Sequence, residues 1–356
     1  MSDSNSQHFD NIFMSICLKL AATALGETYP NPLVGCVIVK DGEIIGEGYH
    51  QKAGGPHAEV NAINSIKDKR ILSEATLYVN LEPCCHHGKT PPCSDLIIEH
   101  KIKEVVVGSL DPNPKVAGKG VQQLMNAGCN VRVGILEDEC KWINRRFFTS
   151  FLKKRPFIIL KWAQSTDGFL SPEKREAKAP VWITGKESRK LVHTWRSEEQ
   201  AILVGINTVL ADNPSLTTRL VKGNSPHRFV IDPHGKTPAD AAVLDKTAST
   251  AIISNVKAPK WPIAGNVTWI ESQNDLIATV LDIAHKNDLQ SIIIEGGTNT
   301  LQRFIDADLW DEARIFTGHN AFGSGTVAPT LKATTVNQYT IEQDQLKILI
   351  PNRAEV

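Results

Sequence analysis

The stretches "HAEVNAI" (residues 57–63) and "EPCCHHGKTPPC" (residues 82–93) decide how this chain is interpreted. The first places a histidine two residues before a glutamate, and the second gathers three cysteines within ten residues, 84–93. Zinc in proteins is held mainly by cysteine thiolates and histidine nitrogens, and a catalytic site keeps three protein ligands and leaves one position for water. His57, Cys84 and Cys93 supply that ligand count.

Glu59 indicates the chemistry of such a site. In zinc-dependent nucleobase deaminases, a glutamate two residues after the ligand histidine moves protons and does not bind the metal. Zinc lowers the pKa of its bound water to about 7, so that hydroxide is available at neutral pH. When this hydroxide attacks an amidine-like carbon, ammonia leaves once a general acid has delivered protons to it. We therefore predict that Glu59 is the catalytic residue of a deaminase.

Cysteine and histidine alone leave a structural zinc site open as an alternative. Such a site normally has four protein ligands, and Cys85 is the remaining candidate. Adjacent cysteines rarely reach one tetrahedral ion, so we expect Cys85 to pack beside the site. Cys93 precedes an amphipathic helix, whose dipole favours a thiolate, and we expect Cys93 to deprotonate most readily.

The 356 residues suit two domains, and strand and helix signals alternate along both halves. "VGCVIVKDGEIIGEGYH" predicts a hairpin that turns at Asp41-Gly42, and the segments after it predict a three-layer α/β sandwich. Residues 137–155 predict one helix that leads away from this unit. We place the boundary near residue 150, with a deaminase domain over 1–150 and a second domain over 151–356.

Composition limits the partners. The 39 basic and 39 acidic residues give zero formal net charge, hence no electrostatic footprint for nucleic acid or an anionic membrane. No basic segment followed by a long apolar core begins the chain, so we expect neither a signal peptide nor a membrane span. The seven cysteines are odd in number and lack the spacing of a disulfide framework, so we expect no disulfides. Free cysteines are typical of a reducing compartment, which indicates the cytoplasm.

The two quoted stretches resemble the deaminase half of the bifunctional riboflavin-biosynthesis deaminase–reductases. Generic deaminases have two residues between the cysteines, whereas this chain has the eight residues 85–92, as those enzymes do. "YPNPLVGCVIVKDGEIIGEGYHQKAGGPHAE" continues the resemblance. One departure is Cys85, where the family usually has serine. The resemblance implies pyrimidine contacts from Asn31 and His50, and ribose-phosphate contacts from His86, Lys89 and Thr90. The alternative interpretation of Lys89 is an ordinary loop lysine that is exposed to solvent and contacts no substrate.

The second half lacks the G-x-G-x-x-G fingerprint of a dinucleotide-binding Rossmann fold. "SIIIEGGTNTLQRFI" predicts a strand, two glycines and a helix whose first amides can hold a phosphate, although a tight turn explains the glycines equally well. "LKWAQSTDG", "WITG", "GINTVLADNPSLTTR" and "IIIEGGTNTL" resemble the reductase half of the same family. That half has a dihydrofolate-reductase-like fold and uses NADPH.

The resemblance implies a role for ten residues of this half. The cofactor contacts would be Trp182, Thr208, Asp212, Gly296, Gly297 and Thr298. The substrate contacts would be Arg196, Leu216, Arg219 and Glu295. Arginine forks suit a ribose phosphate, and surface salt bridges are the alternative for both arginines. Pro180 and Pro233 stand where the family commonly has polar residues, which puts those two contacts in doubt.

These features predict a bifunctional enzyme of riboflavin biosynthesis that uses zinc and NADPH. Deamination of 2,5-diamino-6-(5-phosphoribosylamino)pyrimidin-4(3H)-one and reduction of the ribosyl group would give 5-amino-6-(5-phosphoribitylamino)uracil. We expect a homo-oligomer that binds neither nucleic acid nor membrane. A nucleic-acid or tRNA base deaminase shares the same zinc chemistry, but the zero net charge and the reductase-like half disfavour it. A zinc-stabilised binding module is disfavoured by the full set of catalytic positions.

Overall fold

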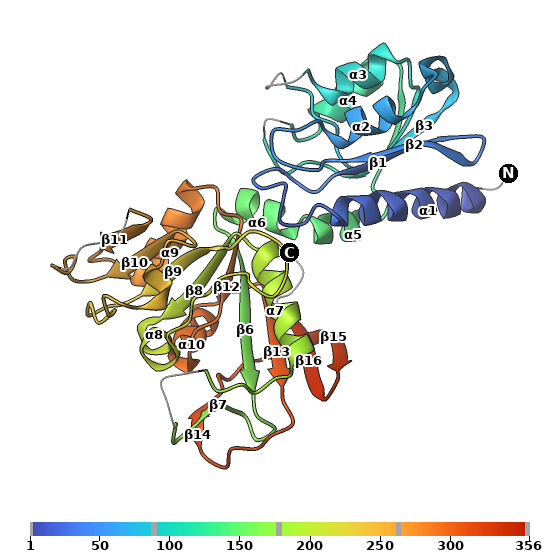
Figure 1. The fold of residues 1–356 in the computed structure, drawn as a ribbon. Coiled ribbons are helices and arrows are strands. Elements are labelled where there is room, and N and C mark those ends of the chain that lie inside the picture. Colours follow the sequence, from blue (N-terminus) through green and yellow to red (C-terminus); the bar gives the residue numbers. More distant parts are fainter. Residues whose placement is uncertain (1–2, 87–90, 115, 176–179, 261–264, 353–356) are drawn as a thin grey trace. The chain divides into compact units, whose positions relative to one another are not determined.

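The computed structural model describes residues 3–86, 91–114, 116–175, 180–260 and 265–352. The chain separates into two compact units, Met1–Lys154 and Arg155–Val356 (Figure 1). Helix α6 (Arg145–Lys153) runs through the predicted boundary near residue 150 and ends just before the second unit. No helix among the described residues is both long and apolar enough to cross a membrane.

The first unit is built on a five-stranded sheet in the order β2-β1-β3-β4-β5. Strands β1 and β2 are antiparallel, β1 and β3 are antiparallel, and β3, β4 and β5 run parallel. The bounds are β1 (Gly35–Lys40), β2 (Glu43–Tyr49), β3 (Thr76–Leu81), β4 (Glu104–Ser109) and β5 (Asn130–Val133). The predicted hairpin is therefore present, and Asp41 and Gly42 form its turn with φ of 52° and 82°, as a type I′ turn requires.

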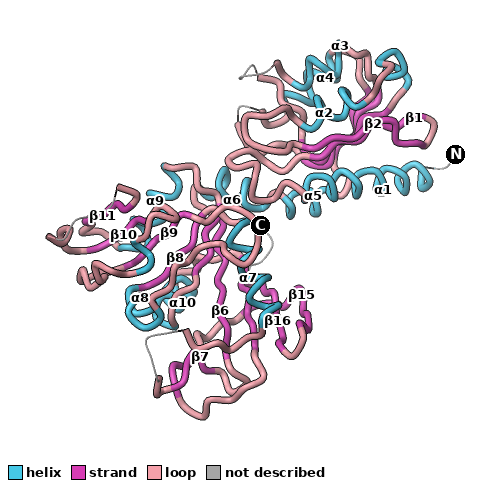
Figure 2. Tube along the Cα trace, in the orientation of Figure 1, coloured by secondary structure: helices cyan, strands magenta, loops and turns pink. Residues whose placement is uncertain are grey.

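Helices cover both faces of this sheet. One face packs against α1 (Asp3–Ala22) and α5 (Glu137–Ile143), and the other against α2 (Ala58–Ser65), α3 (Cys93–Glu99) and α4 (Lys119–Asn126) (Figures 1 and 2). A short 3-10 helix, η1 (Lys69–Glu74), precedes β3. This arrangement is the predicted three-layer α/β sandwich.

The single helix predicted over residues 137–155 is wrong. The structure has two helices, α5 and α6, and Asn144 lies between them. The buried side-chain amide of Asn144 accepts a hydrogen bond from Leu33 N and donates one to Leu33 O, at 2.8 and 2.9 Å. This tertiary contact holds Asn144 at the break, and helical periodicity in the sequence carries no sign of it.

The second unit contains a nine-stranded sheet in the order β11-β10-β9-β8-β12-β6-β13-β16-β15. The strands from β11 to β13 are parallel, and β16 and β15 add an antiparallel hairpin. The bounds are β6 (Phe157–Gln164), β8 (Ala201–Gly205), β9 (His227–Ile231), β10 (Thr250–Ser254), β11 (Val267–Glu271), β12 (Ser291–Ile294), β13 (Glu312–Thr317), β15 (Ala333–Ile341) and β16 (Asp344–Pro351). Two short strands, β7 (Phe169–Pro172) and β14 (Gly325–Val327), pair separately.

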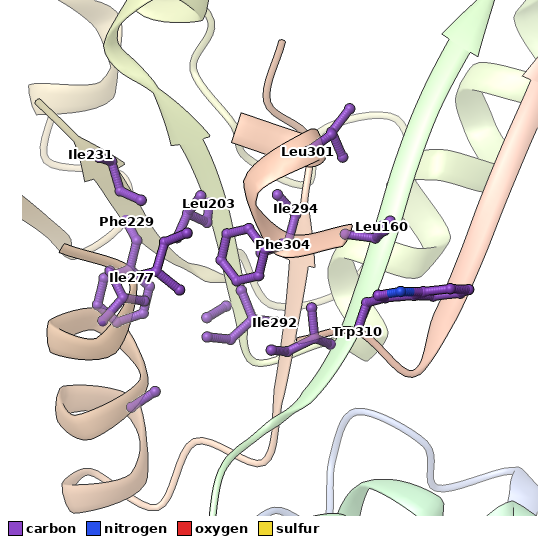
Figure 3. Close-up of a cluster of buried hydrophobic side chains, with 14 of the residues drawn as sticks. Leu160, Leu203, Phe229, Ile231, Ile277, Ile292, Ile294, Leu301, Phe304 and Trp310 are labelled. Carbon is purple, nitrogen blue, oxygen red and sulfur yellow. The ribbon is translucent and has the colours of Figure 1, made fainter. Parts of the chain in front are cut away.

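Helices also cover both faces of the larger sheet. The face covered by α9 (Leu276–Lys286) and α10 (Thr298–Asp306) holds the larger core cluster, in which Phe304 of α10 lies among Leu160, Leu203 and Ile292 (Figure 3). The opposite face is covered by α7 (Lys186–Glu198), α8 (Ile206–Asp212) and the 3-10 turn η2 (Ala242–Leu244). Helix α8 follows β8 directly, and its apolar side chains Ile206 and Val209 are buried in the core.

Candidate functional site

His57, Cys84 and Cys93 come together in the first unit. His57 is the residue before α2, Cys84 follows β3 and Pro83, and Cys93 begins α3. His57 Nδ1 lies 3.2 Å from Cys93 Sγ and 3.5 Å from Cys84 Sγ. Tetrahedral zinc with its usual bond lengths separates a ligand nitrogen from a ligand sulfur by about 3.5 Å. The three donors therefore fit one zinc ion, and Cys85 does not belong to the cluster.

Glu59 lies beside this cluster in the first turn of α2. Its side chain is only 3% exposed, and burial raises its pKa to about 7. The nearby Cys84 contributes to this rise in pKa, while His57 opposes it. A carboxyl group with a pKa near neutrality is suited to both accept and deliver a proton at physiological pH.

We expected Cys93 to deprotonate most readily, and the contacts at the start of α3 favour the thiolate of Cys84. A hydrogen bond from the Cys93 thiol lowers the pKa of Cys84, and the backbone N–H of Cys93 also donates to Cys84 Sγ, at 3.3 Å. The pKa of Cys93 is raised because its thiol donates a hydrogen bond to Cys84 and because the side chain is buried. The N-terminal amide of α3 thus stabilises the neighbouring sulfur, Cys84, as thiolate.

Glu82 is a residue of this site that the sequence did not reveal. One carboxylate oxygen accepts from Gly118 N and Asp111 N, at 2.8 and 3.2 Å, and the other accepts from Gly120 N and Val121 N, at 2.9 and 3.2 Å. A Cβ atom on Gly120 would lie 2.0 Å from Pro83 O, so only glycine permits this approach. The start of α4 is thereby held against the segment that carries Cys84.

The predicted pyrimidine contacts are neighbours. Asn31 Nδ2 lies 3.0 Å from His50 Nε2, and His50 Nδ1 lies 2.9 Å from Pro56 O. Burial lowers the pKa of His50, so the neutral ring donates to Pro56 O and accepts from Asn31. The rings of His50 and His57 meet edge to face with centroids 5.6 Å apart. His86 is exposed, and Lys89 and Thr90 lie outside the described residues.

The second unit contains a pocket of about 1670 Å³. Residues at the carboxyl ends of four neighbouring parallel strands line it: Lys161 of β6, Glu295 after β12, Gly205 of β8 and Pro233 after β9. Ligands of open parallel sheets bind at this edge. All ten residues predicted to contact cofactor or substrate in this half line the pocket, as does Pro180.

A buried group of charges lies at one end of this pocket. Arg196 Nε and Nη2 donate to the two carboxylate oxygens of Glu295, at 3.0 and 2.7 Å, and Lys161 Nζ lies 3.8 Å from Glu295. Although burial raises the pKa of Glu295, Arg196 and Lys161 lower it to about 2. Burial lowers the pKa of Lys161. The pocket therefore holds a fixed carboxylate and a lysine whose proton is less tightly bound than usual.

Arg219 and Leu216 reach the same pocket from the segment after α8. The backbone N–H of Arg219 donates to His193 Nδ1 at 3.1 Å, and burial and the adjacent Arg196 lower the pKa of His193 to about 4. Leu216 is buried and has φ of 58°. Neutral His193 thus acts as the acceptor that positions Arg219.

The predicted cofactor contacts gather along the pocket edge. Gly297 N donates to Thr208 Oγ1 at 3.1 Å, and Thr298 Oγ1 donates to Val327 O. Asp212 accepts from Arg175 at 2.5 Å. Trp182 is 55% exposed, and the guanidinium carbon of Arg189 lies 4.4 Å from its ring centroid.

Lys161 and His193 were not predicted from the sequence. A signal existed for Lys161, a single charged residue inside the apolar run "FIILKWA". A buried lysine is uncommon unless it is paired with a group of opposite charge, so this position indicates a charged site. His193 had no comparable signal, because its partner, the backbone N–H of Arg219, is defined only by the folded loop.

Comparison with known proteins identifies both units. Residues 7–109 match the cytidine and deoxycytidylate deaminase zinc-binding region, and residues 156–347 match the RibD C-terminal domain. Riboflavin biosynthesis protein RibD of Aquifex aeolicus is 43% identical over 325 residues, covering 90% of this chain and 89% of the relative. The Escherichia coli protein of that name is 36% identical over 332 residues, covering 88% and 89%.

Solved structures of related proteins have the same fold as this chain. A diaminohydroxyphosphoribosylaminopyrimidine deaminase/5-amino-6-(5-phosphoribosylamino)uracil reductase from Thermotoga maritima has a TM-score of 0.89 and 38% identity, covering 97% of this chain and 99% of that one. RibD of Acinetobacter baumannii has a TM-score of 0.85 and 33% identity, covering 98% and 100%. The predicted fold class, a cytidine-deaminase-like domain before a dihydrofolate-reductase-like domain, is confirmed. The chain therefore belongs to the RibD family of bifunctional riboflavin-biosynthesis enzymes, with a zinc-dependent deaminase unit and an NADPH-dependent reductase unit.

Proposed function

We propose that the first unit deaminates 2,5-diamino-6-(5-phosphoribosylamino)pyrimidin-4(3H)-one and that the second unit reduces the ribosyl group of the product to give 5-amino-6-(5-phosphoribitylamino)uracil. The observation that carries the first step is the set of His57, Cys84 and Cys93 beside the buried Glu59. The second step is supported by Lys161, Arg196 and Glu295 in the pocket of the reductase unit.

In the deaminase unit, His57, Cys84 and Cys93 would hold zinc, which supplies a water molecule with a lowered pKa. Glu59 would accept a proton from the attacking water, deliver it to the ring nitrogen and assist the departure of ammonia. Asn31 and the neutral His50 would orient the pyrimidine through their hydrogen-bonding groups. His86, Lys89 and Thr90 would contact the ribose phosphate.

In the reductase unit, NADPH supplies a hydride. The ribosyl carbon that receives it must be held in the pocket with its oxygen near a proton donor. Lys161 is suited to donate that proton, because its pKa is lowered and Glu295 holds its ammonium group in place. Arg219 would bind the phosphate and Arg196 would hold Glu295 at the substrate end of the pocket. Trp182, Thr208, Asp212 and Gly296–Thr298 would contact the cofactor.

We also propose that the protein is a cytoplasmic homo-oligomer that binds neither nucleic acid nor membrane. The zero net charge supports the absence of a nucleic-acid partner. The test of the whole function is incubation of the purified protein with the pyrimidine substrate, with and without NADPH, and identification of the products by mass. The deaminated intermediate should accumulate without NADPH and the ribityl compound should form with it. Retention on RNA and deamination of RNA would instead support a tRNA base deaminase.

A further inference from the structure

Helix α7 lines the pocket of the second unit and begins without a cap of its own. Its N-cap residue is Gly185, which has no side chain to accept from the first backbone N–H groups of the helix. In a capping box, the side chain of the third helical residue accepts a hydrogen bond from the N-cap N–H. Here that residue is Ser188, and its hydroxyl donates instead. The start of α7 therefore needs an acceptor from elsewhere in the fold.

Asp344 supplies that acceptor, although it lies 159 residues from Gly185 in the sequence. One oxygen of its carboxylate accepts from Gly185 N at 2.8 Å and from Ser188 Oγ at 2.6 Å. Asp344 is only 2% exposed and Ser188 is fully buried, so water does not satisfy these groups in its place. Asp344 begins β16, directly after the two-residue turn of Glu342 and Gln343. The hairpin of β15 and β16 is thus tied to the start of α7.

The segment just before this anchor faces the pocket. Trp182 and Thr184 both line the pocket, and Ile183 between them is buried. The exposed ring of Trp182 contacts the guanidinium group of Arg189, which belongs to α7. The place of this ring therefore depends on where α7 begins, and the bonds from Gly185 and Ser188 to Asp344 determine that point.

The rest of α7 is held independently of Asp344. Val192 and Trp195 are buried in one core cluster with Phe316 of β13 and Leu346 of β16. Arg196 lies eight residues after Ser188, which is about 12 Å along the helix axis. Loss of the anchor should therefore loosen the first turn of α7 and the segment before it, while the end of the helix that carries Arg196 stays in place.

We propose that Asp344 is a positioning residue of the reductase unit, which fixes residues 182–185 and thereby sets the affinity for the cofactor. The inference rests on the proposed contact between Trp182 and NADPH. Asp344 is not among the described residues that line the pocket, so it acts through Gly185 and Ser188. A segment that is already ordered loses less conformational entropy when a ligand binds, and the ligand is bound more tightly for that reason.

The test separates cofactor affinity from turnover in the zinc-loaded full-length protein. Asp344→Ala should raise the Kd and the KM for NADPH roughly tenfold, because the freed segment must be ordered on binding. The kcat at saturating NADPH and the KM for the deaminated intermediate should change less than about twofold. Asp344→Asn keeps an acceptor for both donors and should restore the Kd to within about threefold of the parent value. Gln343→Ala, an exposed change in the same turn, is the matched control and should bind NADPH as the parent does.

A purely structural role for Asp344 would give a different result. The kcat would fall with the fraction of folded protein while the Kd for NADPH stayed unchanged, and this outcome, or a failure of Asp344→Asn to recover affinity, would overturn the inference. If Asp344→Ala does not fold, Ser188→Ala decides, because it removes one of the two hydrogen bonds. It should raise the Kd for NADPH about threefold, and an unchanged Kd would refute the role of the anchor. If the parent protein itself bound no NADPH, the proposed reductase function would be overturned.

Discussion

Arg196 directs two nitrogens of its guanidinium at the two carboxylate oxygens of Glu295, at 3.0 and 2.7 Å. This two-point pair uses the face of Arg196 that a phosphate would otherwise take. Arg219 has no carboxylate partner of this kind among the residues that the structure describes. The two arginines are therefore not equivalent: Arg219 is suited to bind the phosphate, and Arg196 fixes Glu295 and, through it, Lys161.

The double variant Arg196→Ala with Arg219→Ala should abolish NADPH oxidation driven by the deaminated intermediate. Ammonia release from the first substrate should continue, because the zinc ligands belong to the other unit. Arg219→Ala alone should mainly raise KM, whereas Arg196→Ala should mainly lower kcat, since it leaves buried Glu295 without its partner. Ammonia and NADPH are followed separately, and Lys222→Ala, an exposed change in the same unit, is the control. Unimpaired reduction by the double variant would refute the assignment.

Glu59→Gln should retain zinc and lose deamination by two orders of magnitude or more, because an amide cannot carry the proton. The variant should still reduce the deaminated intermediate when it is supplied directly. Metal analysis and ammonia assays on the same preparation give the answer. Loss of zinc, or near-normal ammonia release, would contradict the role given to Glu59.

Cys84→Ser and Cys93→Ser should each lose zinc, whereas Cys85→Ser should keep it. The physical reason is that Cys84 and Cys93 both reach His57 Nδ1 within 3.5 Å, while Cys85 is outside the cluster. Zinc content is measured by elemental analysis after dialysis, and a chelator should remove both the metal and the ammonia release from the parent protein. An empty site in Cys85→Ser alone would favour a closed structural site.

The stability of the protein should fall as the pH decreases from about 6.5 to about 4, and His193 should contribute to this fall. Burial lowers the pKa of His193 from 6.5 to about 4 in the folded protein, so within this window the unfolded chain binds a proton that the folded chain does not. His193→Asn, which keeps an acceptor for Arg219 N, should flatten the dependence. Chemical denaturation at several pH values measures it, and an unchanged slope in the variant would show that His193 does not contribute.

The sequence was sufficient to predict that His57, Cys84 and Cys93 lie together, because they belong to two short, distinctive segments. The hairpin at Asp41-Gly42 was equally local, since the turn residues alone determine it. What the sequence did not reveal depends on contacts between distant residues. The break at Asn144 requires Leu33, and the Lys161–Glu295–Arg196 group joins three elements of the second unit. Such pairings arise only when the strands are ordered in space.

Glu82 links the zinc-binding segment to amide protons far along the chain. The backbone N–H groups of Gly118 and Gly120 donate hydrogen bonds to the carboxylate of Glu82, which precedes Cys84 by two residues in the sequence. These two amides can exchange with deuterated solvent only when that carboxylate withdraws or the segment opens. Zinc bound by Cys84 should make such opening rarer, so exchange at Gly118 and Gly120 should slow on metal loading. Hydrogen exchange at these two glycines should therefore report whether zinc is bound, and the measurement needs no substrate.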